Sequence, residues 1–196
     1  MDDGPAGAGR GNGRGASGAR LRLSTAVARL VDHGDRPTYG RSVILETLAW
    51  VALVLIGGVL ARIDIREHRL PNRGIALLGA VCLILLGGAA LAEHEPARVL
   101  RAVACGILLF VVLLVMAVAA PGGLGMGDVK FGLVTGIFLG WLGWTWLWWG
   151  TLLAFMLGGA WAMALLAGRR AEPGSRIPFG PFMLAGVLLS AGLSIV

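Results

Sequence analysis

Four ionisable residues lie within or at the ends of long apolar stretches of this chain: Glu46, Asp64, Asp128 and Lys130. Carboxylates at membrane depth are costly and are by default candidates for function. Asp64 lies about one helical turn beyond the first apolar stretch. Asp128 begins the fourth stretch, directly after a glycine-rich run over residues 122–127. If both lie at the same depth of a helical bundle, they can meet although they are far apart in the sequence.

A close pair of carboxyl groups does not readily ionise twice, so one keeps its proton while the other stays charged. Aspartic proteases use such a pair to activate water and to protonate the leaving amine. The spacing of Asp64 and Asp128 also allows a plainer interpretation, in which each caps a helix or pairs with an arginine. Asp128 at a helix start suits an N-cap. Glu46 is expected near the opposite end of its stretch, too far away to join the pair.

The elements that must position these residues are predicted to be membrane helices. The chain has 196 residues, 57% of them hydrophobic and 14% charged, against about 25% charged in soluble domains. Six apolar stretches approach the length of a membrane span; they cover residues 43–61, 74–92, 99–120, 128–142, 144–167 and 179–195. We therefore predict an all-α, polytopic membrane bundle of about six helices over residues 43–196, with a tight turn near residues 140–143. Residues 1–42, with nine glycines and seven arginines, are predicted to be a disordered basic tail.

This composition excludes a soluble enzyme, a disulfide-linked secreted module and an ordinary nucleic-acid-binding protein. The pI near 10.9 comes from arginines, which beside apolar spans set topology more often than they bind nucleic acid. Cys82 and Cys105 lie inside apolar stretches without C-x-x-C spacing. We interpret them as small core residues and predict no metal site.

The distribution of basic residues predicts the orientation. Successive spans alternate in direction, so every second linker lies on the same face. The linkers of one face cover residues 62–73, 121–128 and 168–178. With Lys130 these linkers carry eight cationic residues, whereas the opposite linkers carry Arg98 and Arg101. The positive-inside rule therefore puts Asp64 and Asp128 at the cytoplasmic face. The arginines of the tail would then lie outside, against the rule, but the linkers flank well-defined spans and carry more weight.

Three segments resemble one family of membrane proteases. Residues 125–130, Gly-Met-Gly-Asp-Val-Lys, resemble the G-x-G-D motif of membrane-embedded aspartyl proteases. Residues 64–72 resemble the first-aspartate segment of the type IV prepilin leader peptidases, and residues 176–182, Arg-Ile-Pro-Phe-Gly-Pro-Phe, look like that family's third segment. Signal-peptide peptidases and presenilins share G-x-G-D, but here Ile63 precedes the first aspartate and no Pro-Ala-Leu occurs near the C-terminus. The prepilin branch is therefore favoured.

This resemblance implies an aspartyl endopeptidase of the inner membrane that removes the leader of type IV or Flp-like prepilins at the cytoplasmic face. Asp64 and Asp128 would be its catalytic residues, and its partners would be prepilin-like substrates and the lipid bilayer. No metal or organic cofactor and no nucleic acid is implied. Larger members carry a cysteine-containing insertion and also N-methylate the product; this chain has neither that insertion nor its cysteines, so peptidase activity alone is expected. The alternative is a catalytically inactive assembly or transport component with the same fold.

Glycines around Asp128 have two possible roles. Gly125 and Gly127 could let a substrate or a mobile loop reach the aspartates, or could simply form a flexible turn. Gly132, Gly136 and Gly140 recur every four residues and predict close helix packing. This stripe is a candidate for bringing the helix of Asp128 against that of Asp64.

Other residues near the aspartates are candidate supporting residues. Lys130 is expected to extend its amine to the membrane interface rather than to face Asp128. Pro71 and Asn72 are expected to shape the start of the second span, with Asn72 as its cap. Pro178, Phe179 and Gly180 would line the substrate site or begin the sixth span, and the second role is slightly favoured.

The predicted orientation can be tested by cysteine labelling, with the two native cysteines replaced by alanine. Glu67→Cys and Glu172→Cys should react with a membrane-impermeant reagent only from the cytoplasmic side, because both lie in arginine-rich linkers. Glu95→Cys, in the opposite set of linkers, should react from outside. Labelling from the reverse sides would refute the orientation.

Overall fold

The computed structural model describes residues 36–67, 70–120, 123–168 and 178–194. Backbone contacts divide the chain into Met1–Gly40 and Arg41–Val196. Of the first unit only residues 36–40 are described, so most of the predicted disordered tail lies outside the described residues. Residues 36–42, assigned to that tail, are helical. Pro37 is compatible with this because a helix tolerates proline in its first turn, where the amide has no partner to lose.

The described residues form six α-helices and no β-strand, which confirms the all-helical membrane fold. The helices are α2 (Arg36–Glu67), α3 (Asn72–Ala92), α4 (Pro96–Ala119), α5 (Met126–Leu142), α6 (Trp144–Ala167) and α7 (Gly180–Leu193). Four of them, namely α2, α3, α4 and α6, are long and apolar enough to cross a membrane. The other two have 17 and 14 residues, or about 25 Å and about 21 Å, less than the roughly 30 Å of a hydrocarbon core.

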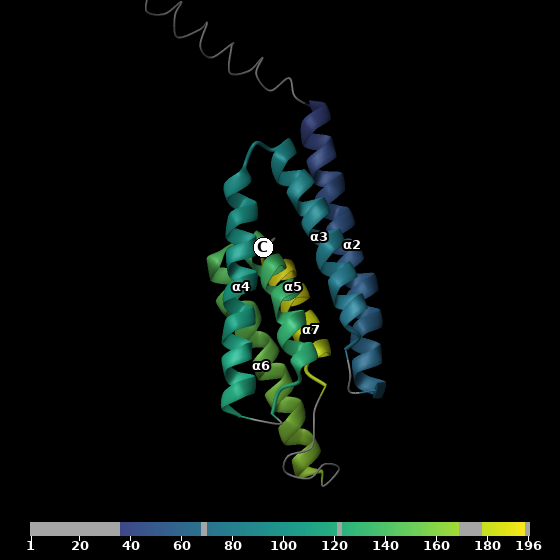
Figure 1. The fold of residues 1–196 in the computed structure, drawn as a ribbon, viewed down its shortest axis with the longest axis vertical. Helices are drawn as coiled ribbons and strands as arrows, with labels where there is room; N and C mark the ends of the chain where they lie inside the picture. The colour runs from purple at the N-terminus through teal and green to yellow at the C-terminus, as the bar shows by residue number, and fades with distance from the viewer. Residues whose placement is uncertain (1–35, 68–69, 121–122, 169–177, 195–196) are drawn as a thin grey trace, which may run out of the picture. The chain divides into compact units, whose positions relative to one another are not determined.

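Successive helices run in opposite directions, so the helix ends that were predicted to share one face lie together. The C-terminal ends of α2, α4 and α6 and the N-terminal ends of α3, α5 and α7 lie at one end of the Arg41–Val196 unit (Figure 1). These ends border the three linkers of the predicted cytoplasmic face, two of which carry seven arginines. Asp64, near the end of α2, and Asp128, at the start of α5, therefore lie at the same end of the bundle.

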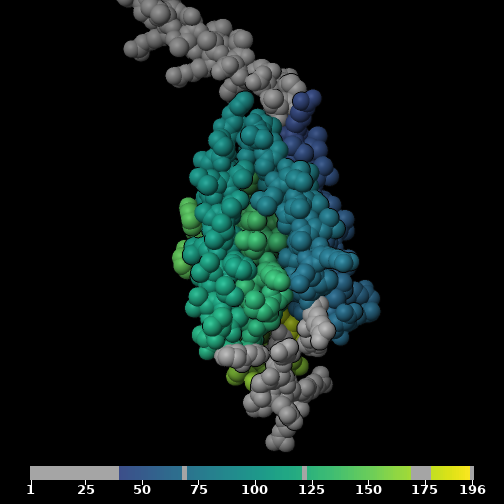
Figure 2. All heavy atoms as spheres, in the orientation of Figure 1, coloured from purple at the N-terminus to yellow at the C-terminus, as the bar shows by residue number. Residues whose placement is uncertain are grey.

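Helix α5 is the buried helix of the bundle. Twelve of its 17 residues are buried, against four of the 24 in α6. It packs against α3, α4, α6 and α7, and in Figure 2 it is seen between α3 and α4. A helix that is apolar on all sides is expected in such a position. Because protein surrounds it, α5 need not match the thickness of the bilayer.

The glycine stripe of α5 packs closely, as predicted, but against α4. A Cβ atom at Gly136 would lie 2.8 Å from the Gly106 Cα, and one at Gly140 would overlap Cys105. The prediction that the stripe faces the helix of Asp64 is wrong, because α4 carries matching small residues where the two backbones meet. Cys105 and Cys82 are free and buried, which confirms them as core residues.

A single glycine separates α5 from α6. Gly143 has φ +141°, a conformation that residues with a Cβ rarely adopt, so the chain reverses within one residue and the predicted tight turn is confirmed. Of the tryptophans near this turn, Trp144, Trp148 and Trp149 are exposed, as an interfacial belt would be. Trp141 differs from them, because its side chain is only 1% exposed.

Substituting Gly136 tests the close packing of α4 on α5. Gly136→Ala should lower the free energy of unfolding in detergent by about 1–3 kcal/mol, because the new methyl group meets backbone atoms that cannot move alone. Gly87→Ala in α3 is the matched control, since a Cβ there has nothing within 4 Å. Equal stability of the two variants would contradict the packing described here.

Candidate active site

Asp64 lies on the buried face of α2, near the C-terminal end of the helix. The helix continues to Glu67, so the linker predicted from residue 62 begins later; no glycine or proline occurs between residues 59 and 70 to end it. Ala49, Leu53, Gly57, Leu60 and Asp64 recur three or four residues apart and are all buried. Asp64, with 4% exposure, therefore continues an apolar stripe.

Asp128 lies in the first turn of α5, at its third residue. The helix begins at Met126 with Gly125 as N-cap, so the interpretation of Asp128 as the N-cap is wrong. Its carboxylate Oδ2 instead accepts a hydrogen bond from the Gly125 N–H at 3.3 Å. A negative charge in this position interacts favourably with the helix dipole. The other oxygen, Oδ1, is buried and has no hydrogen-bond partner among the described residues.

The first turn of α7 brings the two aspartates into one site. The Gly180 N–H donates to Asp64 Oδ2 at 3.1 Å. The same amide also interacts with the Asp128 carboxylate, and the two carboxylates interact with each other electrostatically. A Cβ atom at residue 180 would lie 3.0 Å from Asp64 Oδ2. Gly180 thus both begins the last helix and lines the site, so the two roles considered for this segment coincide.

Leu70 is a site residue that the sequence analysis missed. A Cβ atom at Gly127 would lie 2.8 Å from the Leu70 Cβ, and one at Gly180 would lie 3.6 Å from the Leu70 Cδ1. Leu70 is buried, so it packs between the glycines that neighbour the two aspartates. The sequence offered one indication of this role, namely a single leucine between the charged residues of the linker and Pro71. Gly127 is needed for this close approach.

Lys130 and Asn72 link α5 to the start of α3. The Lys130 amine donates to Asn72 Oδ1 at 2.9 Å, at an exposed position. The prediction of Asn72 as a helix cap is wrong: the cap position is Pro71, and no side chain caps this helix. Asn72 is instead the first helical residue, and its side chain is directed to Lys130. This link lies at the same end of the bundle as the aspartates.

Comparison with known families decides the family of the chain. The model of the type IV leader peptidase family matches residues 50–165, more than half of the chain. The chain belongs to this family. Membership implies peptidase activity in general and a membrane location. The match includes Asp64 and Asp128 but not the segment from residue 176 onward. Comparisons with curated proteins and with solved structures gave no match.

An apolar groove adjoins the aspartates of this leader peptidase family member. It has a volume of about 330 Å³ and is lined by Met116, Ala120, Gly123, Leu124, Phe155, Gly158, Gly159, Ala162 and Phe179. Leu124 and Phe179 directly precede Gly125 and Gly180, whose amides bind the two carboxylates. Pro178, which directly precedes Phe179, is half-buried. The groove is thus close enough for a bound chain to reach the site.

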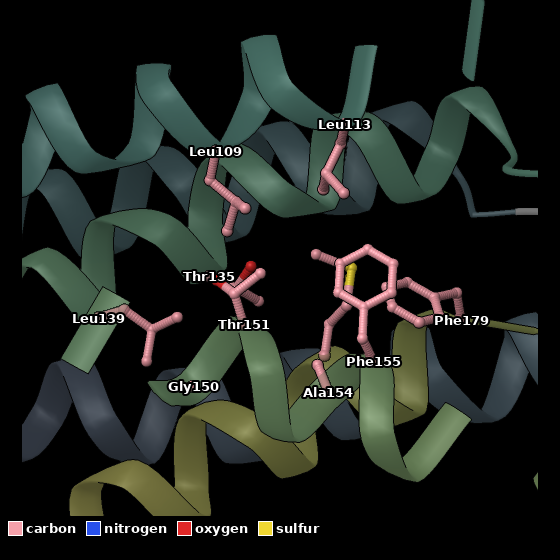
Figure 3. Close-up of a pocket in the computed structure, with 10 residues that line it drawn as sticks. Leu109, Leu113, Thr135, Leu139, Gly150, Thr151, Ala154, Phe155 and Phe179 are labelled. Atoms are coloured by element: carbon pink, nitrogen blue, oxygen red, sulfur yellow. The ribbon is translucent and has the colours of Figure 1, made fainter. Parts of the chain in front are cut away.

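A second, smaller cavity shares Phe155 and Phe179 with this groove. It is lined by residues of α4, α5, α6 and α7 and by Phe179, and it has a volume of about 10 Å³ (Figure 3), room for about one water molecule. Thr135 and Thr151 line it, and the Thr151 hydroxyl has no hydrogen-bond partner among the described residues. This cavity is too small for a peptide. The described residues contain no group of three histidine, cysteine or acidic side chains that could hold a metal.

Substituting Gly180 tests its place between the aspartates. Gly180→Ala should lower the rate of leader cleavage at least about tenfold, because the methyl group would displace the Asp64 carboxylate and small displacements of reacting groups are costly. Gly192→Ala, in the same helix, is the control because a Cβ there meets nothing within 4 Å. Cleavage is followed on gels with a purified substrate. Wild-type cleavage by Gly180→Ala would contradict the geometry.

Proposed function

We propose that this protein is an aspartic endopeptidase that removes the leader from type IV or Flp-like prepilins. Asp64 and Asp128 are its catalytic pair, and it acts at the cytoplasmic face of the inner membrane without a metal or organic cofactor. The observation that carries the proposal is the Gly180 amide, which interacts with both buried carboxylates. Two carboxyl groups held together and away from bulk water are what acid–base peptide hydrolysis needs.

The proposed chemistry uses one proton shared by the pair. The ionised carboxyl takes a proton from water as the oxygen attacks the scissile carbonyl, and the protonated carboxyl donates its proton to the developing oxyanion. The carboxyl that took the proton from water then donates it to the leaving nitrogen, the C–N bond breaks, and the other carboxylate takes a proton from a hydroxyl of the intermediate, so that both products leave and the pair again holds one proton. Oδ1 of Asp128, which lacks a hydrogen-bond partner among the described residues, can accept a hydrogen bond from the attacking water whichever of the two carboxyls is ionised. The proton belongs to the pair and is not assigned to either residue.

The surroundings of the pair suit an extended substrate with an apolar portion. In the proposed complex, the scissile bond lies at the two aspartates while the apolar portion occupies the groove of about 330 Å³. Phe179 and Leu124 would contact it beside the catalytic carboxyls. Gly125 and Gly180 then keep side chains away from the two carboxylates, and the Lys130–Asn72 hydrogen bond joins the start of α5 to the start of α3.

Replacing each aspartate by its neutral isostere tests the proposal against the alternative of an inactive assembly or transport component. The protein is co-expressed with a candidate prepilin, and leader removal is followed by gel shift. Asp64→Asn and Asp128→Asn should each lower processing at least about 100-fold, because each removes one acid–base partner. Both variants should remain in the membrane at normal levels.

Glu67→Gln is the matched control, since Glu67 is an exposed carboxylate on the same helix as Asp64. It should process the prepilin at the wild-type rate. Full processing by either asparagine variant would refute the catalytic pair. An absence of processing by the wild-type protein with several prepilins would favour the inactive component.

A further inference from the structure

A second polar cluster lies where α5 ends, at the opposite end of this helix from Asp128. The Trp141 Nε1–H donates to Glu46 Oε1 at 2.9 Å. The Arg98 guanidinium lies 4.0 Å from the centre of the Trp141 ring and 3.5 Å from Glu46 Oε1. Arg98 also pairs with Glu93 at 3.0 Å. The cluster thus joins α2 and α5 through Glu46 and Trp141, with Arg98 of α4 held against both.

Arg101 fixes the end of α5 in the same region. Its Nε donates to the Gly140 carbonyl at 2.9 Å, and its Nη2 donates to the Trp141 carbonyl at 3.1 Å. These carbonyls belong to the last turn of α5, where no intrahelical donor remains for them. A cation there is also favoured by the helix dipole. The backbone around Trp141 is therefore held in place, and so is the indole that binds Glu46.

The two helices joined by this cluster are those that carry the two aspartates. Glu46 and Asp64 lie on α2, and Trp141 and Asp128 lie on α5. Between the two ends, α2 meets its neighbours through apolar contacts, such as Trp50 with Phe138. Such contacts have little directional preference, whereas a hydrogen bond from a buried indole does. A shift of α2 by one residue turns each side chain by about 100° and would remove Asp64 from the site.

We infer that the Glu46–Trp141 hydrogen bond fixes the register of α2 against α5 and thereby positions Asp64 beside Asp128. This inference rests on the proposed function, because it makes Glu46 a positioning residue for the catalytic pair. Glu46 itself does not reach the reacting atoms. Its carboxylate is directed to Trp141 and Arg98, at the other end of the bundle.

Kinetics of purified variants test this role. Glu46→Leu and Trp141→Phe each remove the hydrogen bond. Each should lower kcat on the order of tenfold to 100-fold, because Asp64 is no longer held in position beside Asp128. KM should stay within about twofold, because neither substitution changes the residues that bind the substrate. Glu46→Gln keeps an acceptor for the indole and should retain kcat within about threefold of wild type. Glu93→Gln, which loses only an ion pair to Arg98, is the control and should behave as wild type.

A distance measurement tests the register without relying on activity. Spin labels are attached to Ile65→Cys and Met126→Cys, two exposed positions that neighbour the aspartates, and the distance is measured by pulsed electron paramagnetic resonance. Glu46→Leu should broaden or shift the distance distribution, and Glu46→Gln should restore it.

The outcomes separate this inference from the proposed function. An unchanged distance in Glu46→Leu, or wild-type kcat in that variant, overturns the positioning role. A loss of kcat with an unchanged distance also overturns it, because the effect would then be general destabilisation. If the wild-type protein cleaves no prepilin, the proposed function fails, and the distance distribution still decides whether Glu46 sets the register.

Discussion

Two carboxyl groups buried next to each other set the requirement that the rest of this structure meets. Removing a carboxylate from water and placing it beside another is costly unless hydrogen bonds offset the lost solvation. The starts of two helices provide these bonds, the Gly125 N–H to Asp128 and the Gly180 N–H to Asp64. Amides at helix N-termini are free to donate, and the helix dipole favours negative charge there. The N-terminal ends of α5 and α7 thus make the burial of both carboxyl groups possible.

Close packing then holds these helix starts in place. Glycines of α5 allow its backbone to approach that of α4, so the helix that carries Asp128 is surrounded by protein on several sides. Leu70 packs against Gly127 and beside Gly180 and covers the same region. Helix α2 lacks such a glycine interface with α5, so its register depends on side chains, among them Asp64 at one end and Glu46 at the other. Side chains at both ends of α2 therefore help to position Asp64 beside Asp128.

Much of the architecture could be predicted from the sequence, because apolar length, glycine spacing and helix alternation are local features. The bounds of α6 and the turn at Gly143 agree with the prediction, and Asp64 and Asp128 lie at one end of the bundle. Tertiary contacts decided what the sequence alone did not show. The partner of the glycine stripe and the bond from Lys130 to Asn72 depend on which helices become neighbours.

The polar cluster at the far end shows the same limit. Arg98 and Arg101 were interpreted only as charges that set topology, and Glu46 as a residue too far from the aspartates to join the pair. Their contacts with Trp141 arise only when α2, α4 and α5 meet. A tryptophan among several interfacial ones gave no signal of its own. Its burial, at 1% exposure, separates it from its neighbours.

The most direct measurement of the central claim is a double-mutant cycle on kcat/KM for prepilin cleavage, with Asp64→Asn, Asp128→Asn and the double variant. If the two aspartates work as one acid–base pair, removing either one disables the pair, and the double variant should be no slower than the slower single variant. If the losses of the two single variants multiply in the double variant, the aspartates act independently, and the catalytic pair is contradicted.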